Sequence, residues 1–132
     1  MCTPAYSATL ERVPESAATA RYLVRSALDA WHLPGLRDSA AHIMSELVAN
    51  AVRHARGRLI RVTVTRTRRC RVRLAVVDFD AARFPRAVAA SPDDERGRGL
   101  GIVAELAESW GVRSMSNRKQ VWADVEQTKG AT

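Results

Sequence analysis

The sequence has little cysteine and no long hydrophobic run. Only Cys2 and Cys70 occur in 132 residues, and neither lies in a Cys-x-x-Cys or Cys/His pattern. This excludes a disulfide framework and predicts two reduced thiols. No apolar run approaches the roughly 18 residues that a membrane span needs, and the first 16 residues lack a basic segment followed by an apolar one. We therefore expect a cytoplasmic protein that does not associate with a membrane.

Two common glycine-rich phosphate motifs are also missing. The sequence has no GxxxxGK[ST] loop, and its glycines near residue 100 do not form the GxGxxG fingerprint of dinucleotide-binding proteins. In that fingerprint an acidic residue follows the glycines by about 20 positions. Here Asp78 precedes Gly97 by 19 positions. Neither motif therefore explains the glycines of this chain.

The composition is that of one ordinary globular domain. With 46% hydrophobic and 27% charged residues, the chain is close to the average of folded proteins, and 132 residues leave no room for a second domain. We expect residues 1–126 to form a single domain and residues 127–132 to form a frayed tail.

Basic residues outnumber acidic ones, 21 to 14, and many of them gather in one block. Residues 53–73 contain nine arginines and no carboxylate. Such a block can contact phosphate, nucleic acid or an acidic protein. It can equally be the solvated face of a hairpin, because one-sided strands alternate polar and apolar residues. The block contains no Phe, Tyr or Trp to stack on bases, which argues against nucleic acid.

Hydrophobic periodicity predicts both helices and strands. Helical spacing of apolar residues occurs in residues 16–31, 38–55 and 99–109, and strand-like alternation in residues 6–12, 59–67, 71–78, 112–115 and 120–125. Ser16 and Asp38 are the expected N-caps of the first two helices. Residues 79–98 form a loop of about 20 residues, and a loop of that length in so small a domain is usually functional.

Four polar residues on the second predicted helix share one face. His42, Glu46, Asn50 and His54 recur every four residues, so they form a stripe beside the apolar stripe of the helix. Asn50 is unfavourable inside a helix, but its amide oxygen suits a hard cation such as Mg²⁺. Glu46, one turn earlier, can accept a proton or position a water. The four residues can also be ordinary polar residues that border a buried face.

Two further features follow along the chain. Asp78 ends a strand, where it can accept a hydrogen bond from an exocyclic amine such as that of adenine, or simply terminate the strand. The segment Gly97-Arg98-Gly99-Leu100-Gly101 opens the third predicted helix, and glycines there let backbone N–H groups approach a phosphate. A flexible hinge is the alternative. The order of these features predicts a nucleotide site that the long loop closes as a lid.

These features resemble the GHKL ATPase and kinase superfamily. Residues 45–55, SELVANAVRHA, resemble its N box; Asp78 resembles the aspartate of its first glycine box, and residues 97–103, GRGLGIV, resemble its second. Together with Trp110-Gly111-Val112 and residues 121–125, VWADV, the likeness covers about residues 8–126. Within the superfamily the chain resembles the small, single-domain anti-sigma-factor type of serine/threonine kinase.

The resemblance implies an α/β (α+β) fold, a two-layer Bergerat-type sandwich with about three helices on one face of a mixed, mostly antiparallel sheet of about five strands. It implies that ATP and Mg²⁺ bind between helices and lid. Glu46 would be the general base, Asn50 the Mg²⁺ ligand and Asp78 the residue that reads adenine. His54 would point toward the phosphates. The lid residues that contact phosphate would be Gly97, Arg98, Gly99, Leu100 and Gly101.

The sequence departs from the family pattern at two places. The first glycine box reads Asp78-Phe79-Asp80-Ala81-Ala82, so both of its glycines are replaced, and Asp80 would bring a negative charge near the nucleotide. Many members carry a threonine just before the closing Val-Trp pair, where this chain has Gln120. A small hydroxyl that assists the adenine aspartate is therefore expected to be missing.

Two main functions are consistent with these features. The first is an ATP-binding regulator that holds a sigma factor or phosphorylates an anti-anti-sigma partner of the STAS type; dimers are common among such relatives. The second is a nucleotide-sensing or partner-sequestering module without catalysis, which the missing glycines favour. Nucleic acid binding through the arginine block is a third and weaker hypothesis.

Overall fold

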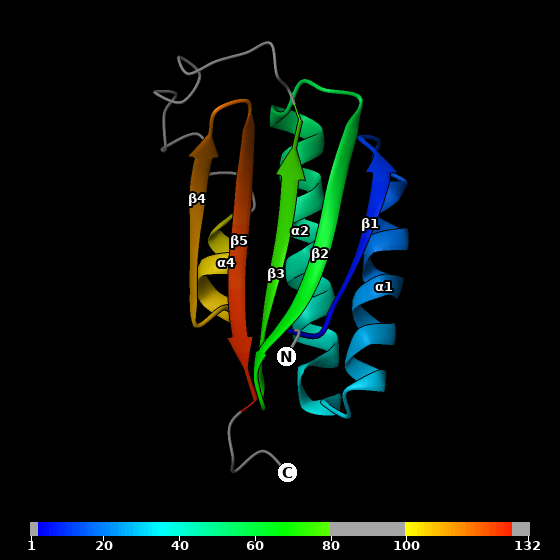
Figure 1. Ribbon diagram of the computed structural model, residues 1–132, viewed down its shortest axis with the longest axis vertical. Helices are drawn as coiled ribbons and strands as arrows, with labels where there is room; N and C mark the ends of the chain where they lie inside the picture. The colour runs from blue at the N-terminus through cyan, green and yellow to red at the C-terminus, as the bar shows by residue number, and fades with distance from the viewer. Residues whose placement is uncertain (1–2, 80–99, 128–132) are drawn as a thin grey trace.

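Three helices lie against one face of a five-stranded sheet (Figure 1). The computed structural model describes residues 3–79 and 100–127. Along the chain its elements are β1 (Ala5–Glu11), α1 (Ser16–Ala30), the short 3₁₀ helix η1 (Pro34–Leu36), α2 (Arg37–His54), β2 (Leu59–Arg68), β3 (Arg71–Asp78), α4 (Leu100–Leu106), β4 (Ser109–Met115) and β5 (Arg118–Glu126). The prediction of a two-layer sandwich is confirmed.

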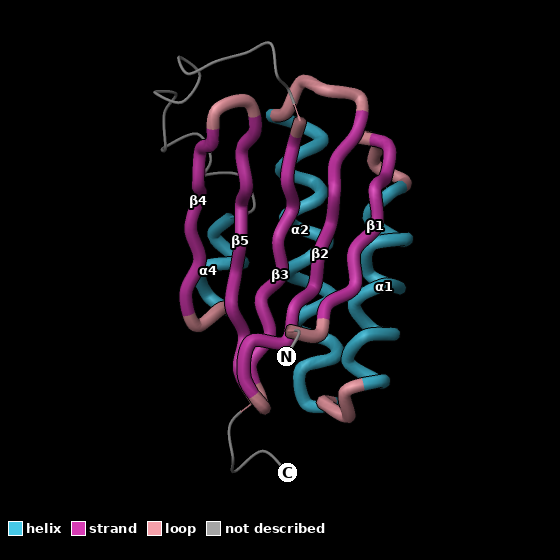
Figure 2. The backbone as a smooth tube through the Cα atoms, in the orientation of Figure 1, coloured by secondary structure: helices cyan, strands magenta, loops and turns pink. Residues whose placement is uncertain are grey.

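The strands pair in the order β1-β2-β3-β5-β4 (Figure 2). The expected mostly antiparallel sheet is confirmed, and within the described residues every neighbouring pair is antiparallel. β4 precedes β5 in sequence but occupies the edge of the sheet, so β5 lies directly beside β3. Two strands from distant parts of the chain therefore form the middle of the sheet.

One face of the sheet is apolar because every second residue along its central strands is a buried apolar residue. The buried positions of β2, β3 and β5 are Ile60, Val62, Val64, Val72, Leu74, Val76, Val121, Ala123 and Val125. Directly opposed residues share a face of the sheet; Leu74, for example, pairs with Val64 on one side and Ala123 on the other. A slip by one residue would turn this whole apolar set toward solvent. Burial therefore specifies the register of the strands.

The helices cover this apolar face in a fixed order. α1 packs against β1 and β2, α2 packs against β3 and β5, and α4 lies beside α2 and β4 (Figure 1). α2 turns a buried stripe toward the sheet, which includes Ile43, Met44, Leu47, Val48 and Ala51. Full burial of each large apolar side chain contributes roughly 2 kcal/mol. This stripe holds the neighbouring polar row of α2 close to the sheet.

Both predicted N-caps are wrong. The N-cap residue of α1 is Glu15, and Ser16 is already helical; its Oγ donates a hydrogen bond to the carbonyl oxygen of Glu11 at 2.7 Å. The N-cap residue of α2 is Leu36, and Asp38 lies within the first turn. A carboxylate in the first turn still interacts favourably with the positive end of the helix dipole. In both helices the polar residue stabilises the start of the helix from a position other than the cap.

The third predicted helix is too long, and the strand that follows it is too short. α4 ends at Leu106, and β4 begins at Ser109 rather than at residue 112. Gly111 allows this extension, because a Cβ atom at this position would lie 2.9 Å from the ring of Trp122 on β5. Because residue 111 has no side chain, β4 can pair with β5 at Gly111 without a clash with the indole ring of Trp122.

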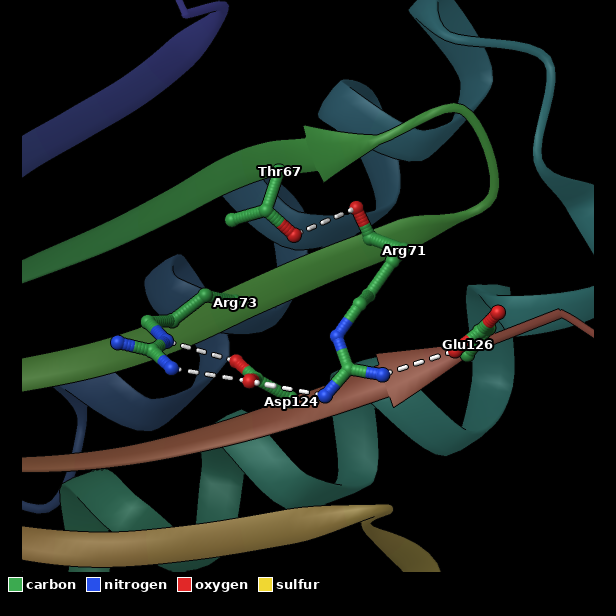
Figure 3. Close-up of polar contacts among 5 residues, drawn as sticks. All are labelled: Thr67, Arg71, Arg73, Asp124 and Glu126. Atoms are coloured by element: carbon green, nitrogen blue, oxygen red, sulfur yellow. Dashed lines mark hydrogen bonds and ion pairs between the residues drawn. The ribbon is translucent and has the colours of Figure 1, made fainter.

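The face of the sheet that no described helix covers carries a network of ion pairs (Figure 3). Asp124 on β5 is 4% exposed, and it accepts hydrogen bonds from Nε of Arg73 at 2.7 Å and Nη2 of Arg71 at 3.2 Å. Arg71 also donates to Glu126 at 2.8 Å, and the guanidinium of Arg73 lies 4.1 Å from the centre of the Trp122 ring. Two arginines of the basic block therefore join β3 to β5.

The carboxyl group of Asp124 titrates below its ordinary range. Burial raises its pKa, but Arg73 and then Arg71 outweigh burial through hydrogen bonds and charge, so the pKa lies below its ordinary value of 3.8. A carboxyl group whose pKa is lower in the folded chain stabilises the fold fully above the unfolded pKa, near pH 4. The stabilisation is lost as the pH falls through the folded pKa.

We expect Asp124→Asn to lower the free energy of unfolding by about 1–3 kcal/mol at neutral pH, because it leaves two half-buried guanidinium groups without their carboxylate. Urea unfolding measures this loss, and the difference from the wild type should shrink as the pH falls below about 4 and through the lowered pKa of Asp124. The matched control is Asp29→Asn, which breaks an exposed 2.9 Å ion pair with Arg37 and should cost less than about 1 kcal/mol. Equal losses of unfolding free energy in the two variants would contradict a stabilising role of the Asp124 ion pairs.

Candidate functional site

A pocket opens between α2 and the ends of β3 and β5. Its lining residues are Leu47, Asn50, Ala51, His54 and Ala55 from α2 and its C-cap, Val76 and Asp78 from β3, and Lys119 and Val121 from β5. The space between these residues, counted together with the open solvent at its mouth, is about 260 Å³. The walls are mostly apolar, and the polar side chains come from three different elements. This lining suits a small ring system with a polar edge.

The structure divides the predicted polar row of α2. Asn50 and His54 line the pocket together with Asp78. Glu46 lies one turn earlier, with its side chain 25% exposed and its Oε2 3.7 Å from Nε2 of His42. The side chain of His42 is 52% exposed. Asn50, His54 and Asp78 thus come together, whereas Glu46 lies next to the pocket and His42 lies farther toward solvent.

Asn50 carries a buried polar atom that no described residue satisfies. The residue is 1% exposed, and its Oδ1 has no hydrogen-bond partner among the described residues. A buried acceptor without a partner costs about 1–3 kcal/mol, so such an atom in a native structure calls for a ligand, ion or water. Its position in the lining of the pocket makes Asn50 the strongest single indication of a binding site.

The donor set around Asn50 fits Mg²⁺ but does not form a complete cage. Mg²⁺ prefers oxygen ligands and usually keeps several waters, with substrate phosphates supplying further ligands. Among residues 3–79 and 100–127, no group of three or more His, Cys, Asp or Glu side chains could hold a metal by itself. A cation at Asn50 Oδ1 would therefore arrive with a phosphate ligand rather than bind to the protein alone.

Asp78 and Lys119 stand opposite each other at the end of the sheet. Asp78 is 8% exposed, and the register of β3 and β5 pairs it directly with Lys119. Gln120 pairs instead with Val77, so its side chain belongs to the other face of the sheet. Lys119, and not Gln120, therefore occupies the place beside Asp78, and sequence analysis missed it. Counting by twos from the buried Val121 would have identified Lys119 as a residue of the helix-covered face.

The predicted phosphate-binding glycines lie largely outside the described residues. This applies to Gly97, Arg98 and Gly99, and also to Asp80, Ala81 and Ala82 of the first box. Leu100 is fully buried in the core, so its side chain is committed to packing. Gly101 is exposed, and a Cβ atom there would meet no described atom within 4 Å. Space alone therefore does not require glycine at residue 101.

Basic residues surround this end of the molecule. Arg53 and Arg56 flank the C-terminal end of α2, Arg118 begins β5, and all three are exposed. The guanidinium of Arg118 lies 5.8 Å from the centre of the Phe79 ring, next to Asp78 in the chain. A cleft bordered by one sign of charge attracts ligands of the opposite sign. The pocket therefore favours a ligand with a negatively charged portion.

Comparison with known protein families gives a match over most of the chain. Residues 10–124 match the family described as histidine kinase-like ATPase domain. The matched segment contains every residue that lines the pocket. No curated protein matches the chain. None of the described helices is long and apolar enough to cross a membrane.

A solved structure with a similar fold contains the RsbU and RsbW domains of Rv1364c from Mycobacterium tuberculosis. The TM-score is 0.69, the sequence identity is 22%, and the similarity covers 94% of this chain and 32% of that one. This chain thus spans about a third of the length of that protein. At this level of identity, the similarity establishes the fold alone.

We expect Asn50→Leu to leave the free energy of unfolding unchanged or to raise it by about 1 kcal/mol, because it removes a buried oxygen that has no described partner. Urea unfolding measures the change. The matched control is Leu47→Asn one turn earlier, which buries a new amide in the core and should cost about 3 kcal/mol. A clear loss of stability in Asn50→Leu would mean that the Asn50 oxygen is satisfied in solution.

Proposed function

The chain belongs to the histidine kinase-like ATPase family, and from this premise we propose that it is an ATP-binding anti-sigma regulator with serine/threonine kinase activity. The observation that carries the proposal is the pocket at the end of β3 and β5. There a buried carboxylate, Asp78, and a buried amide oxygen without a described partner, Asn50 Oδ1, line the same space. The first suits the exocyclic amine of a base, and the second suits a cation.

The adenine ring would occupy the apolar part of the pocket. Leu47, Ala51, Val76 and Val121 supply apolar surface for the two faces of the ring. Asp78, held at the end of β3, would accept a hydrogen bond from the N6 amino group. A hydrogen bond to a charged acceptor in a buried site contributes about 1.5–3 kcal/mol, which is enough to distinguish an amino group from a group that cannot donate.

The phosphates would extend toward the C-terminal half of α2 and the glycine segment. His54 lines this part of the pocket, and Arg53 and Arg56 contribute positive charge next to it. Mg²⁺ bound with ATP would neutralise the phosphate charge and orient the γ-phosphoryl group. Asn50 would offer Oδ1 to the cation, and backbone N–H groups of residues 97–101 would close over the phosphates.

Glu46 would act on the hydroxyl group of the phosphate acceptor. It lies one helical turn before Asn50, on the same face of α2, and its side chain keeps a 25% exposure that allows an incoming serine or threonine to approach. The carboxylate would accept the hydroxyl proton while the γ-phosphoryl group passes from ATP to the hydroxyl oxygen and ADP leaves. General-base assistance of this kind typically increases the rate by about 10² to 10⁴.

We infer the protein partners from the anti-sigma-factor type of serine/threonine kinase that the chain resembles. We expect the acceptor to be a cytoplasmic anti-anti-sigma protein of the STAS type, and the second partner to be a sigma factor. The fold similarity to a structure that contains an RsbW domain supports this choice. A homodimer is compatible with the proposal, because relatives of this type commonly dimerise.

A second candidate is a module that binds nucleotide and sequesters a partner without catalysis. One observation favours it: Glu46 lies outside the lining of the pocket and is close to His42, at 3.7 Å. In that arrangement Glu46 would be an ordinary helix-surface carboxylate. Binding and phosphoryl transfer therefore have to be measured separately.

For nucleotide binding, Asp78→Asn should weaken ATP at least about tenfold, because the neutral amide oxygen is a weaker acceptor for the N6 amino group than the carboxylate is. Calorimetric titration with Mg-ATP measures the effect. Asp38→Asn, an exposed position in the first turn of α2, is the control and should bind like the wild type. If Asp78→Asn bound Mg-ATP with the affinity of the wild type, the result would contradict the placement of the adenine base in this pocket.

For catalysis, Glu46→Gln should bind Mg-ATP with nearly wild-type affinity and transfer phosphate about 10² to 10⁴ times more slowly. The measurement is transfer of labelled γ-phosphate to a STAS-type protein. Glu15→Gln, at the exposed start of α1, serves as the control. If the wild type binds ATP but transfers no phosphate, the sequestering module is the correct function. If Glu46→Gln transfers phosphate at the wild-type rate, another group takes the proton.

A further inference from the structure

Lys119 is the one polar residue of the pocket lining that the proposed function does not use. It stands directly opposite Asp78 in the register of β3 and β5, and both residues line the pocket. Directly opposed residues in an antiparallel pair have Cβ atoms only about 5 Å apart. A carboxylate and an ammonium group are thus presented side by side at the end of the pocket.

The position of Lys119 is enforced by the core. Val121, Ala123 and Val125 of β5 are at most 5% exposed and face the helices. Because side chains alternate along a strand, the residue two positions before Val121 must face the same side. Lys119 is only partly exposed, although lysine is normally a surface residue. Lys119 therefore contributes to the wall of the pocket.

The pair offers complementary hydrogen-bonding groups to the edge of a purine. The carboxylate of Asp78 accepts hydrogen bonds, and the ammonium group of Lys119 can donate up to three. Adenine can donate from N6 to Asp78 and accept at N1 from Lys119. Guanine presents these groups in the opposite order, so it would bind with its base turned over relative to adenine, donating from N1 and N2 to Asp78 and accepting at O6 from Lys119, which gives three hydrogen bonds instead of two. A lone carboxylate would instead face the O6 oxygen of guanine with no donor nearby.

We propose that Lys119 is a second base-reading residue, which allows this pocket to bind guanine nucleotides as well as adenine nucleotides. The proposal rests on the proposed function, because it requires that a nucleobase occupies the pocket. It assigns to Lys119 a hydrogen bond to N1 of adenine or to O6 of guanine. The ability to bind both adenine and guanine nucleotides is a property of the Asp78–Lys119 pair and not of either residue alone.

The test compares binding of Mg-ATP, Mg-GTP, Mg-ITP and Mg-CTP by calorimetry. Inosine keeps O6 and the N1 hydrogen of guanine but lacks the N2 amino group, so ITP isolates the contact between Lys119 and O6. The variant is Lys119→Met, which keeps most of the apolar stem and removes the charge and the donors. The matched control is Arg118→Met, which removes the same charge from the adjacent, exposed position. Urea unfolding of both variants establishes that they are folded.

In the wild type, GTP and ITP should bind within about tenfold of ATP, and CTP should bind much more weakly. Lys119→Met should weaken GTP and ITP at least about tenfold, since a charge-assisted hydrogen bond is lost to O6, and should weaken ATP less. Arg118→Met should change all purine nucleotides by the same small factor.

Three results would overturn the proposal. The first is a wild type that binds ATP but neither GTP nor ITP. The second is a Lys119→Met variant that binds GTP and ITP as the wild type does. The third is an equal loss for all nucleotides in Lys119→Met and Arg118→Met, which would reduce Lys119 to general electrostatic attraction. If ATP binding persists and depends on Asp78, the proposed function survives any of these results. If no nucleotide binds to the wild type, the proposed function itself fails.

Discussion

The candidate site depends on the register of β3 against β5. These strands are separated by a long stretch of chain, and their pairing places Asp78 opposite Lys119. The pairing is favoured by the apolar residues further along the same strands, because a slip by one residue would turn the buried side chains of Val72, Leu74 and Val76 toward solvent. The same pairing is reinforced on the other face of the sheet, where Arg71 and Arg73 bind Asp124. The core and the ion pairs therefore define the geometry of the pocket, whose apolar walls, such as Val76 and Val121, are part of the core.

α2 combines structural and functional roles on adjacent stripes. Its apolar stripe is buried against the sheet and sets the height of the helix above β3 and β5. Its polar row runs along the edge of that contact, so Asn50 is carried into a buried position where its oxygen lacks a described partner. A residue that disfavours helix formation and leaves a buried acceptor unsatisfied is poor for stability. Such a local conflict is expected at a functional site, where selection acts on binding rather than on folding.

Much of the fold could be predicted from the sequence, because its strongest signals are local. The alternation in residues 59–67 and 71–78 predicted β2 and β3 to within one residue at their ends. Asn50 and His54, four residues apart on α2, both line the pocket. The start of β4 was misplaced, because the segment Ser109-Trp110-Gly111 becomes a strand only by pairing with β5 and by leaving room for Trp122. That contact is not visible in local periodicity.

Lys119 shows most clearly where local patterns are insufficient. Its side of the sheet could be deduced from the alternation of β5, but its partner could not, because the strand order places β5 beside β3 across a crossover. Family resemblance directed attention to Gln120, one position further along, and a shift of one residue on a strand changes the face of the sheet. What local sequence patterns did not reveal was thus the long-range pairing of β5 with β3, and not the type of residue at position 119.

The arginine block illustrates how one feature of a sequence can separate into several structural roles. Arg53 and Arg56 lie at the pocket end of α2, whereas the β2–β3 hairpin carries Arg69 to the opposite end of the sheet (Figure 1). Arg71 and Arg73 point to the face away from the helices and are engaged by Asp124. Arg53 and Arg56 therefore add positive charge near the pocket, whereas Arg71 and Arg73 link β5 to β3, the two strands whose other ends line the pocket.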